Sequence, residues 1–177
     1  MKQYVDLLIK WNRAINLISK NTINDVWERH IADSEQLLEF IDKEDRVIDV
    51  GSGGGLPGIV IAMNGVKNVT LVEADKRKAA FLLQASQLTP YNVNVINKRV
   101  EDVNSECDIL TARAFASIND ILRACSGITV TKKMLLLKGE SVEAELREAL
   151  RNWRFDYALY PSKTNKKSWI VELRELL

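Results

Sequence analysis

The residues best placed to do chemistry form a glycine-rich segment that begins at an acidic residue. Its sequence over residues 49–58 is DVGSGGGLPG. Glycines tolerate positive φ angles and let a ligand approach the bare backbone. Pro57 suits the first turn of a helix, where its missing N–H is not needed, and the first N–H groups of such a helix lack intrahelical partners. The segment therefore predicts a binding loop between a strand and a helix.

The spacing of Gly53, Gly55 and Gly58 fits the dinucleotide pattern GxGxxG, but Asp49 changes the ligand that it favours. A carboxylate repels a pyrophosphate and attracts a cationic ligand. S-adenosylmethionine (SAM) carries a sulfonium and an ammonium group and has no phosphate. We therefore predict that Asp49, Gly51, Gly53 and Gly55 bind SAM. A nicotinamide or flavin site and a structural glycine turn are the alternatives.

Two further acidic positions follow predicted strands. Glu73 ends the second strand, where an acid commonly accepts hydrogen bonds from ribose hydroxyls. The alternative is a solvated carboxylate at a strand end. Val100 and Glu101 follow the third strand, where they could meet the edge of an adenine, although residues 99–102 could equally form a surface ion cluster.

The elements that must position these residues follow from hydrophobic spacing. Apolar residues recur every three or four positions over residues 3–17 and 24–41, which predicts two helices before any strand. From residue 46, short β-branched runs alternate with helical stretches. We predict strands at 47–50, 69–72, 93–96, 108–111 and 134–138, and helices at 58–64, 76–88, 118–125 and 141–151. Residues 155–160 and 168–173 predict a closing antiparallel pair.

This alternation is typical of a doubly wound parallel sheet. Strands that are apolar along their whole length fit burial on both faces of such a sheet. We therefore predict one α/β domain over residues 1–177, Rossmann-like and with an antiparallel last strand. Residues 1–43 would form an N-terminal helical cap and residues 44–177 the core.

Composition excludes several classes of protein. The 177 residues include 25 Lys and Arg against 24 Asp and Glu, a net charge of +1, which excludes a highly basic nucleic-acid coat. Two cysteines and one histidine disfavour a disulfide scaffold or a metal site, so we predict no metal. No apolar run approaches the ~20 residues that span a bilayer, so we expect a cytoplasmic monomer without membrane contact.

Seven segments together resemble a known family. They are WNRAINL (11–17), RHIADS (29–34), DVGSGGGLPGI (49–59), VEADKRKAAFL (72–82), RVED (99–102), ARAFAS (112–117) and LLKGE (136–140). The chain resembles the bacterial small-subunit ribosomal RNA guanine-N7 methyltransferases, also called glucose-inhibited division protein B. Many methyltransferases share the glycine-rich loop, whereas its combination with RHIADS, ARAFAS and LLKGE is much more specific. The resemblance implies a class I methyltransferase fold that binds SAM and releases S-adenosylhomocysteine, with cofactor contacts at Gly51, Leu56, Glu73, Val100, Glu101 and Arg113.

The resemblance also implies methylation of N7 of one guanosine in 16S ribosomal RNA, as naked RNA or within the small subunit. Guanine N7 has a free lone pair at neutral pH, so an in-line transfer needs no general base. Alignment of the reactants can then supply on the order of 7–11 kcal/mol. A SAM-dependent methyltransferase of another substrate, a nicotinamide-dependent oxidoreductase and a non-catalytic assembly factor are the rival functions.

Four further residues complete the predicted site. Arg113 follows the fourth predicted strand and Lys138 ends the fifth, and we predict that both are catalytic, through contact with guanosine, cofactor or a phosphate. A structural role is the alternative for each. His30 and Asp33 lie three residues apart on a predicted helix and are expected to form a hydrogen-bonded pair that docks the cap.

Overall fold

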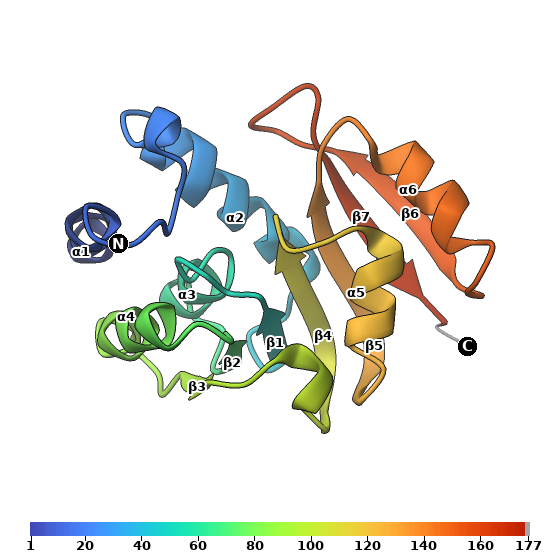
Figure 1. Ribbon diagram of the computed structural model, residues 1–177, viewed down its shortest axis with the longest axis horizontal. Helices are drawn as coiled ribbons and strands as arrows, with labels where there is room; N and C mark the ends of the chain where they lie inside the picture. Colours follow the sequence, from blue (N-terminus) through green and yellow to red (C-terminus); the bar gives the residue numbers. More distant parts are fainter. Residues whose placement is uncertain (176–177) are drawn as a thin grey trace.

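A twisted seven-stranded sheet forms the centre of the computed structural model, which describes residues 1–175 (Figure 1). The strand order is β3-β2-β1-β4-β5-β7-β6. The strands β1 to β5 are parallel, whereas β7 runs antiparallel to both β5 and β6. The bounds are Arg46–Val50 (β1), Asn68–Val72 (β2), Asn94–Ile96 (β3), Ser105–Arg113 (β4), Ile128–Lys138 (β5), Asp156–Pro161 (β6) and Trp169–Arg174 (β7). The predicted α/β fold with an antiparallel last strand is confirmed.

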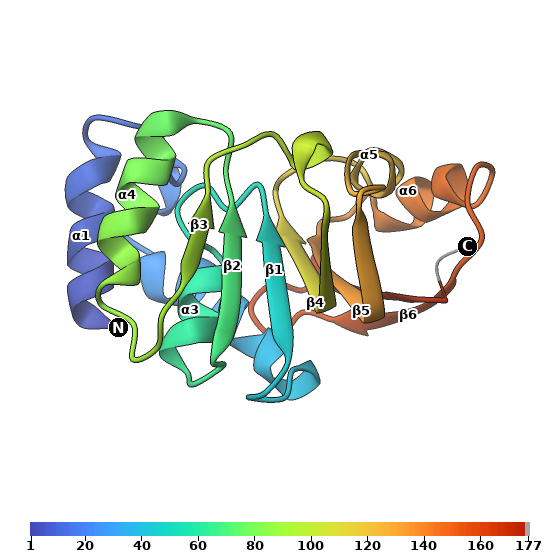
Figure 2. The ribbon, with the colours of Figure 1, turned by 90° about the horizontal axis from the view of Figure 1, so that it is seen from below.

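Helices cover both faces of this sheet (Figure 2). One face carries α1 (Lys2–Asn12), α3 (Gly58–Met63) and α4 (Lys76–Ser86), whose buried side chains join one hydrophobic cluster. The other face carries α5 (Ile118–Ala124) and α6 (Val142–Ala149), which belong to a second cluster. Neighbouring residues of one strand point to opposite clusters: Leu135 and Leu137 of β5 to the first, Met134 and Leu136 to the second. Burial on both faces explains why the strand sequences are apolar along their length.

The N-terminal cap differs from the prediction in the length of its first helix. The helix predicted over residues 3–17 ends at Asn12. The Asn12 side-chain oxygen accepts the backbone N–H groups of Leu17 and Ile18, at 2.8 and 3.0 Å. Because an asparagine side chain can satisfy turn N–H groups in this way, the chain leaves the helix and turns toward the sheet.

The second predicted helix, over residues 24–41, is a helical path that changes its winding twice. It consists of a π-helix (Trp27–Ala32, η2), one α-helical turn (Asp33–Glu35, α2) and a 3₁₀ segment (Gln36–Phe40, η3). Short 3₁₀ segments also lie at Lys20–Thr22 (η1) and Val100–Asp102 (η4). Within residues 1–175 no helix has the length and hydropathy needed to cross a membrane.

Candidate functional site

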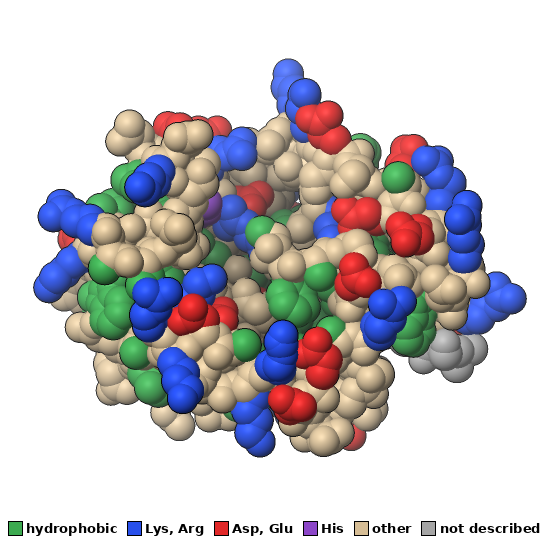
Figure 3. Space-filling view, in the orientation of Figure 1, with side chains coloured by type: hydrophobic (Ala, Val, Ile, Leu, Met, Phe, Trp, Pro, Cys, Tyr) green, Lys and Arg blue, Asp and Glu red, His purple; other side chains and the backbone are tan. Residues whose placement is uncertain are grey.

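The predicted site residues gather at the carboxyl ends of the parallel strands, where the space-filling view shows a hollow between the cap and the C-terminal hairpin (Figure 3). The chain turns at Ala114, the first residue after β4, which has a positive φ of 49°. Three compartments meet there. We call them the ribose, loop and hairpin compartments. The ribose compartment is lined by Gly51, Val72, Glu73, Ala74, Lys78, Arg99, Val100, Glu101, Ala114 and Phe115. The loop compartment is lined by Leu17, Ile18, Ser19, His30, Gly51, Ser52, Gly53, Gly54, Leu56, Lys78, Arg113 and Ala114. The hairpin compartment lies between the cap, the ends of β4 and β5, and the loop that joins β6 to β7, and its lining includes Asp33, Arg113, Lys138 and Asn165.

The glycine-rich loop requires glycine at specific positions. Gly51, Gly53 and Gly55 have φ angles of +64°, +53° and +79°. A Cβ atom on Gly51 would lie 2.3 Å from a ring carbon of Phe115. A Cβ atom on Gly55 would lie 2.5 Å from the Ile59 side chain, so this glycine serves the packing of α3. Of the predicted contacts, Gly51 and Gly53 line the crevice and Gly55 lies behind it.

Asp49 lies beneath the loop instead of on the crevice wall, with a side chain that is 0% exposed. One carboxylate oxygen accepts the Thr111 hydroxyl at 2.8 Å and the other accepts the Gly58 N–H at 3.3 Å. Burial raises the pKa of Asp49 from 3.8 to about 6, although the hydrogen bonds from Thr111, Ser52 and Gly58 oppose this. The predicted direct contact with a cationic ligand is therefore corrected: Asp49 joins β1, β4 and the start of α3 and so shapes the loop.

Glu73 does stand at the crevice, as predicted. Its two carboxylate oxygens accept the backbone N–H groups of Gly53 and Asp75, both at 2.8 Å. Each oxygen has about two lone pairs, so each can accept one more hydrogen bond from a ligand. Asn97, which the sequence analysis missed, donates to the carbonyls of Glu73 and Ala74 at 2.8 and 3.1 Å and fixes the turn after β2.

The remaining predicted cofactor residues are divided between two compartments. Val100, which is buried, and Glu101, which is exposed, line the ribose compartment together with Glu73. Leu56 lines the loop compartment. Lys78 of α4 lines both compartments. The predicted cofactor residues Gly51, Gly53, Leu56, Glu73, Val100 and Glu101 thus line two adjoining compartments that share Gly51, Lys78 and Ala114.

The cap supports the loop from behind through Tyr4 of α1. The Tyr4 hydroxyl donates to the carbonyl oxygen of Gly54, and the ring is 0% exposed. Burial raises the pKa of this phenol, so the hydroxyl keeps the proton that it donates. The N-terminal segment is therefore part of the site's construction.

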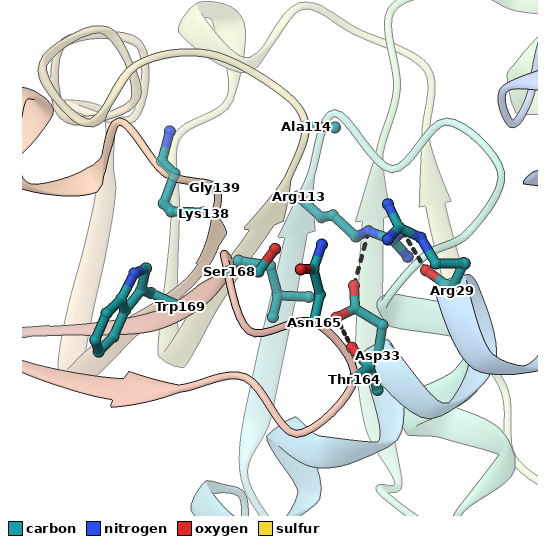
Figure 4. A pocket seen from close by; sticks show the side chains of 11 residues that line it. Arg29, Asp33, Arg113, Ala114, Lys138, Gly139, Thr164, Asn165, Ser168 and Trp169 are labelled. Carbon is teal, nitrogen blue, oxygen red and sulfur yellow. Dashed lines mark hydrogen bonds and ion pairs between the residues drawn. The ribbon is translucent and has the colours of Figure 1, made fainter.

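Arg113 is enclosed by the cap. Its Nε lies 3.3 Å from an Asp33 carboxylate oxygen, and one terminal nitrogen lies 2.8 Å from both the Arg29 carbonyl and His30 Nδ1 (Figure 4). The other terminal nitrogen has only a long contact of 3.5 Å, to the His30 carbonyl. Arg113 lines both the loop compartment and the hairpin compartment. The terminal nitrogen with the long contact is therefore the one that can bind a ligand.

These contacts fix the protonation of His30. A guanidinium only donates, so His30 Nδ1 accepts from Arg113 and the proton sits on Nε2, 2.7 Å from the Thr22 hydroxyl. Burial, with the charges of Arg113 and Arg29, lowers the pKa of His30 from 6.5 to about 4. His30 and Asp33 were expected to pair with each other; each instead contacts Arg113, and together they dock the cap.

Lys138 is also held by protein groups. Its ammonium lies 2.7 Å from a Glu145 carboxylate oxygen and donates to the Ala116 carbonyl. Its side chain is 9% exposed and lines the hairpin compartment. The ion pair with Glu145 compensates the charge that was predicted to act on a substrate.

The part of the chain that the structure describes holds no cluster of metal-ligating side chains. Both thiols are buried and free, and burial raises the pKa of Cys107 and Cys125 to about 12. Neither thiol is therefore a nucleophile at neutral pH.

Comparison with known proteins gives a family and a fold. A family model described as "GidB: rRNA small subunit methyltransferase G" matches residues 1–170. A protein named ribosomal RNA small subunit methyltransferase G from Orientia tsutsugamushi (strain Boryong) is 47% identical over 98% of this chain and 88% of its own length. A protein of the same name from Rickettsia rickettsii (strain Sheila Smith) is 47% identical over 96% of this chain and 90% of its own.

Solved structures with the same architecture are methyltransferases of low sequence identity. Magnesium protoporphyrin IX methyltransferase from Synechocystis PCC 6803, solved with bound SAM, superposes with a TM-score of 0.66 at 14% identity and covers 97% of both chains. The glycopeptide N-methyltransferase MtfA, solved with S-adenosylhomocysteine, has a TM-score of 0.66 at 14% identity, covering 81% of this chain and 89% of its own. The Rossmann-like class I methyltransferase fold is confirmed.

Proposed function

Since this chain belongs to the GidB family, rRNA small subunit methyltransferase G, we propose that it transfers the methyl group of SAM to N7 of one guanosine in 16S ribosomal RNA. The observation that carries the cofactor assignment is the Glu73 carboxylate at the crevice wall. It is fixed by two backbone N–H groups and keeps acceptor capacity on both oxygens. A ribose presents two adjacent hydroxyl donors, which matches that pair of acceptors.

The compartments suggest how a SAM molecule would be held. Glu73 would accept its ribose hydroxyls, with Val100 and Glu101 beside the adenine. The loop compartment would receive the methionine end, where the bare backbone of Gly51 and Gly53 permits close approach and the less engaged nitrogen of Arg113 can reach a carboxylate. When bound, SAM supplies an electrophilic methyl group on its sulfonium.

The residues of the chain would act mainly by alignment. Guanine N7 carries its own lone pair, so no side chain has to remove a proton before transfer. The groups nearest the meeting point of the compartments are held by other protein groups, as Arg113 is by Asp33 and Lys138 by Glu145. We assign Arg113 to orienting the cofactor and Lys138 to positioning the turn after β4, through its bond to the Ala116 carbonyl.

The substrate assignment is tested by mapping methylation of 16S ribosomal RNA from cells that lack this protein. The proposal expects loss of one 7-methylguanosine and its return when the purified protein, SAM and small ribosomal subunits are incubated together. An unchanged map would reject the RNA substrate. Calorimetric titration with SAM and with NAD separates the rival functions, since heat with NAD alone would indicate an oxidoreductase.

Replacing Glu73 tests the cofactor site itself. Glu73→Ala removes the acceptors expected for the ribose and should weaken SAM binding by about 1–3 kcal/mol. Glu143→Ala is the matched control because Glu143 is exposed on α6 and makes the same change of charge. SAM affinity that is equal in the two variants would contradict the role of Glu73.

A further inference from the structure

The hairpin compartment lies on the far side of Arg113 and Ala114 from the ribose compartment, and no cofactor atom is assigned to it. Its walls come from the cap, from the ends of β4 and β5, and from the loop between β6 and β7 (Figure 4). Its lining residues are Arg29, Asp33, Arg113, Ala114, Leu137, Lys138, Gly139, Thr164, Asn165, Ser168 and Trp169. The Asn165 amide and the Ser168 hydroxyl lie between Lys138 on one side and Arg113 on the other.

The acidic group of this compartment, Asp33, is engaged by three protein donors. One Asp33 oxygen accepts the Gln36 amide at 2.9 Å and the Thr164 hydroxyl at 2.8 Å. The other lies 3.3 Å from Arg113 Nε. Asp33 therefore offers little to a ligand.

The groups that remain are donors. Within residues 1–175, the guanidinium of Arg29, the amide nitrogen of Asn165 and the hydroxyl of Ser168 make no hydrogen bond or ion pair. The Asn165 oxygen accepts the Lys167 N–H at 3.0 Å, which leaves the amide nitrogen as the free end of that side chain. A cation, an amide donor and a hydroxyl thus surround one space that contains no free carboxylate.

From this arrangement we propose that the hairpin compartment binds a phosphate group of the RNA backbone, next to the nucleoside that is methylated. This inference rests on the proposed function. Phosphate oxygens only accept hydrogen bonds, and charge-assisted bonds from a guanidinium are about twice as strong as neutral ones. The Watson–Crick edge of guanine instead presents N1–H and an amino group, which need acceptors, whereas the unpaired cation of this space, Arg29, can only donate.

The loop that carries Asn165 is fixed to the cap, so its donors have a defined position. The Gln36 side-chain oxygen accepts the Lys163 N–H at 3.1 Å, and Thr164 bonds to Asp33. A phosphate at Asn165 would therefore be held at a set position relative to Arg113 and the cofactor crevice, which would help to align the neighbouring base.

Three variants test this site through RNA affinity, measured by filter binding of a labelled 16S ribosomal RNA transcript over a series of salt concentrations. Arg29→Ala removes the free cation. Asn165→Asp keeps the oxygen that bonds to Lys167 but places a negative charge beside the phosphate. Arg154→Ala is the matched control, because Arg154 is exposed and precedes the start of β6, whereas the hairpin compartment lies at the other end of that strand.

We expect Arg29→Ala and Asn165→Asp each to weaken RNA binding about 10-fold at low salt and to reduce the slope of log K against log salt by about one. Arg154→Ala should change affinity less than about 2-fold. SAM affinity, measured by calorimetry, should stay unchanged in all three, so a failure of this site is distinguishable from a failure of the cofactor assignment.

Three results would overturn the inference. The first is RNA affinity that falls no further in Arg29→Ala and Asn165→Asp than in the Arg154→Ala control. The second is a wild-type protein that does not bind the transcript. The third is a loss of inorganic-phosphate binding in the two variants, measured by calorimetry, with RNA affinity unchanged, which would identify a site for free phosphate instead of the RNA backbone.

Discussion

At the carboxyl ends of β1 and β2 the polar groups are carboxylates that accept backbone N–H groups, whereas at the ends of β4 and β5 they are cations held by an ion pair and by backbone carbonyls. Asp49 and Glu73 accept the N–H groups of Gly58 and Gly53 and so fix the path of the loop. Arg113, in contrast, is paired with Asp33, and Lys138 with Glu145. The region at the ends of β1 and β2 forms a surface that a ligand can approach. The region at the ends of β4 and β5 holds the cap and the β6–β7 hairpin against that surface. Four tests, taken in order of expected effect, examine this difference with six substitutions.

Arg113→Ala should have the largest effect, because it leaves Asp33 and His30 without their shared partner. We expect the free energy of unfolding to fall by about 3 kcal/mol, as for other broken buried ion pairs, and SAM affinity to fall as well. Chemical denaturation measures the first quantity. Lys138→Met should cost less, because it removes the partner of one side chain only, and Glu145 keeps the Ser141 hydroxyl and the Ile118 N–H as donors. An equal loss of unfolding free energy in both variants would show that Arg113 holds the structure no more strongly than Lys138 does.

The pH dependence of stability separates Asp49 from His30. The pKa of Asp49 is raised to about 6, so the folded state holds a proton that the unfolded chain has released, and stability falls as pH rises from about 4 to 6. The cost of ionising folded Asp49 is about 3 kcal/mol relative to the unfolded chain. The pKa of His30 is lowered from 6.5 to about 4, so between these pH values the unfolded chain holds a proton that the folded state has released. The contribution of His30 to stability therefore rises with pH from about 4 to 6.5 and opposes that of Asp49.

The changes of stability with pH that the two groups cause should therefore nearly cancel in the wild type. Each should become visible in the variant that lacks the other group. Asp49→Asn should be more stable at pH 6.5 than at pH 4.5, and His30→Gln the reverse, in urea unfolding at the two pH values. If both variants keep the wild-type slope, neither group has the shifted pKa assigned to it.

Gly51→Ala should damage the loop region directly. A left-handed φ costs a non-glycine residue about 2 kcal/mol, and the new methyl group would overlap the Phe115 ring. We expect lower stability in thermal denaturation and a loss of SAM binding in calorimetry. Gly139→Ala is the control at the same edge of the sheet, because nothing lies within 4 Å of its added Cβ atom. Normal SAM binding by Gly51→Ala would show that the loop does not need this shape.

Tyr4→Phe should have the smallest effect. It removes one hydrogen bond to the Gly54 carbonyl and keeps the buried ring, so we expect a loss of about 1 kcal/mol in stability. SAM affinity should fall slightly as the loop loses its support from α1. Backbone amide exchange at residues 51–55 would detect that loosening. Exchange as slow as in the wild type would mean that the cap does not brace the loop.

The contrast between the two regions also explains what the sequence could predict. The glycine-rich loop and Glu73 belong to one strand–loop–helix–strand unit, so their spacing along the chain predicts their meeting in space. Arg113 meets His30 across 83 residues, and no local pattern contains that contact. The role of Asp49 was misjudged because spacing places it at the end of β1 but does not show that Thr111 and Gly58 enclose it.

Element boundaries were least predictable where burial changes along a strand. The strand predicted at 134–138 is the buried end of β5, which starts at Ile128. Its first half includes exposed Thr129, which pairs with Glu106 of β4, and exposed Thr131 and Lys132, which lie where the register with β4 shifts; none of the three carries an apolar signal. The first helix was predicted too long because Ile15 keeps the apolar spacing after the chain has already turned at Asn12.

The most direct measurement is a crystal structure of this protein with S-adenosylhomocysteine. The account predicts both ribose hydroxyls within hydrogen-bond distance of the Glu73 carboxylate and the adenine beside Val100 and Glu101. A nucleoside bound elsewhere on the chain, or one whose ribose faces away from Glu73, would contradict it.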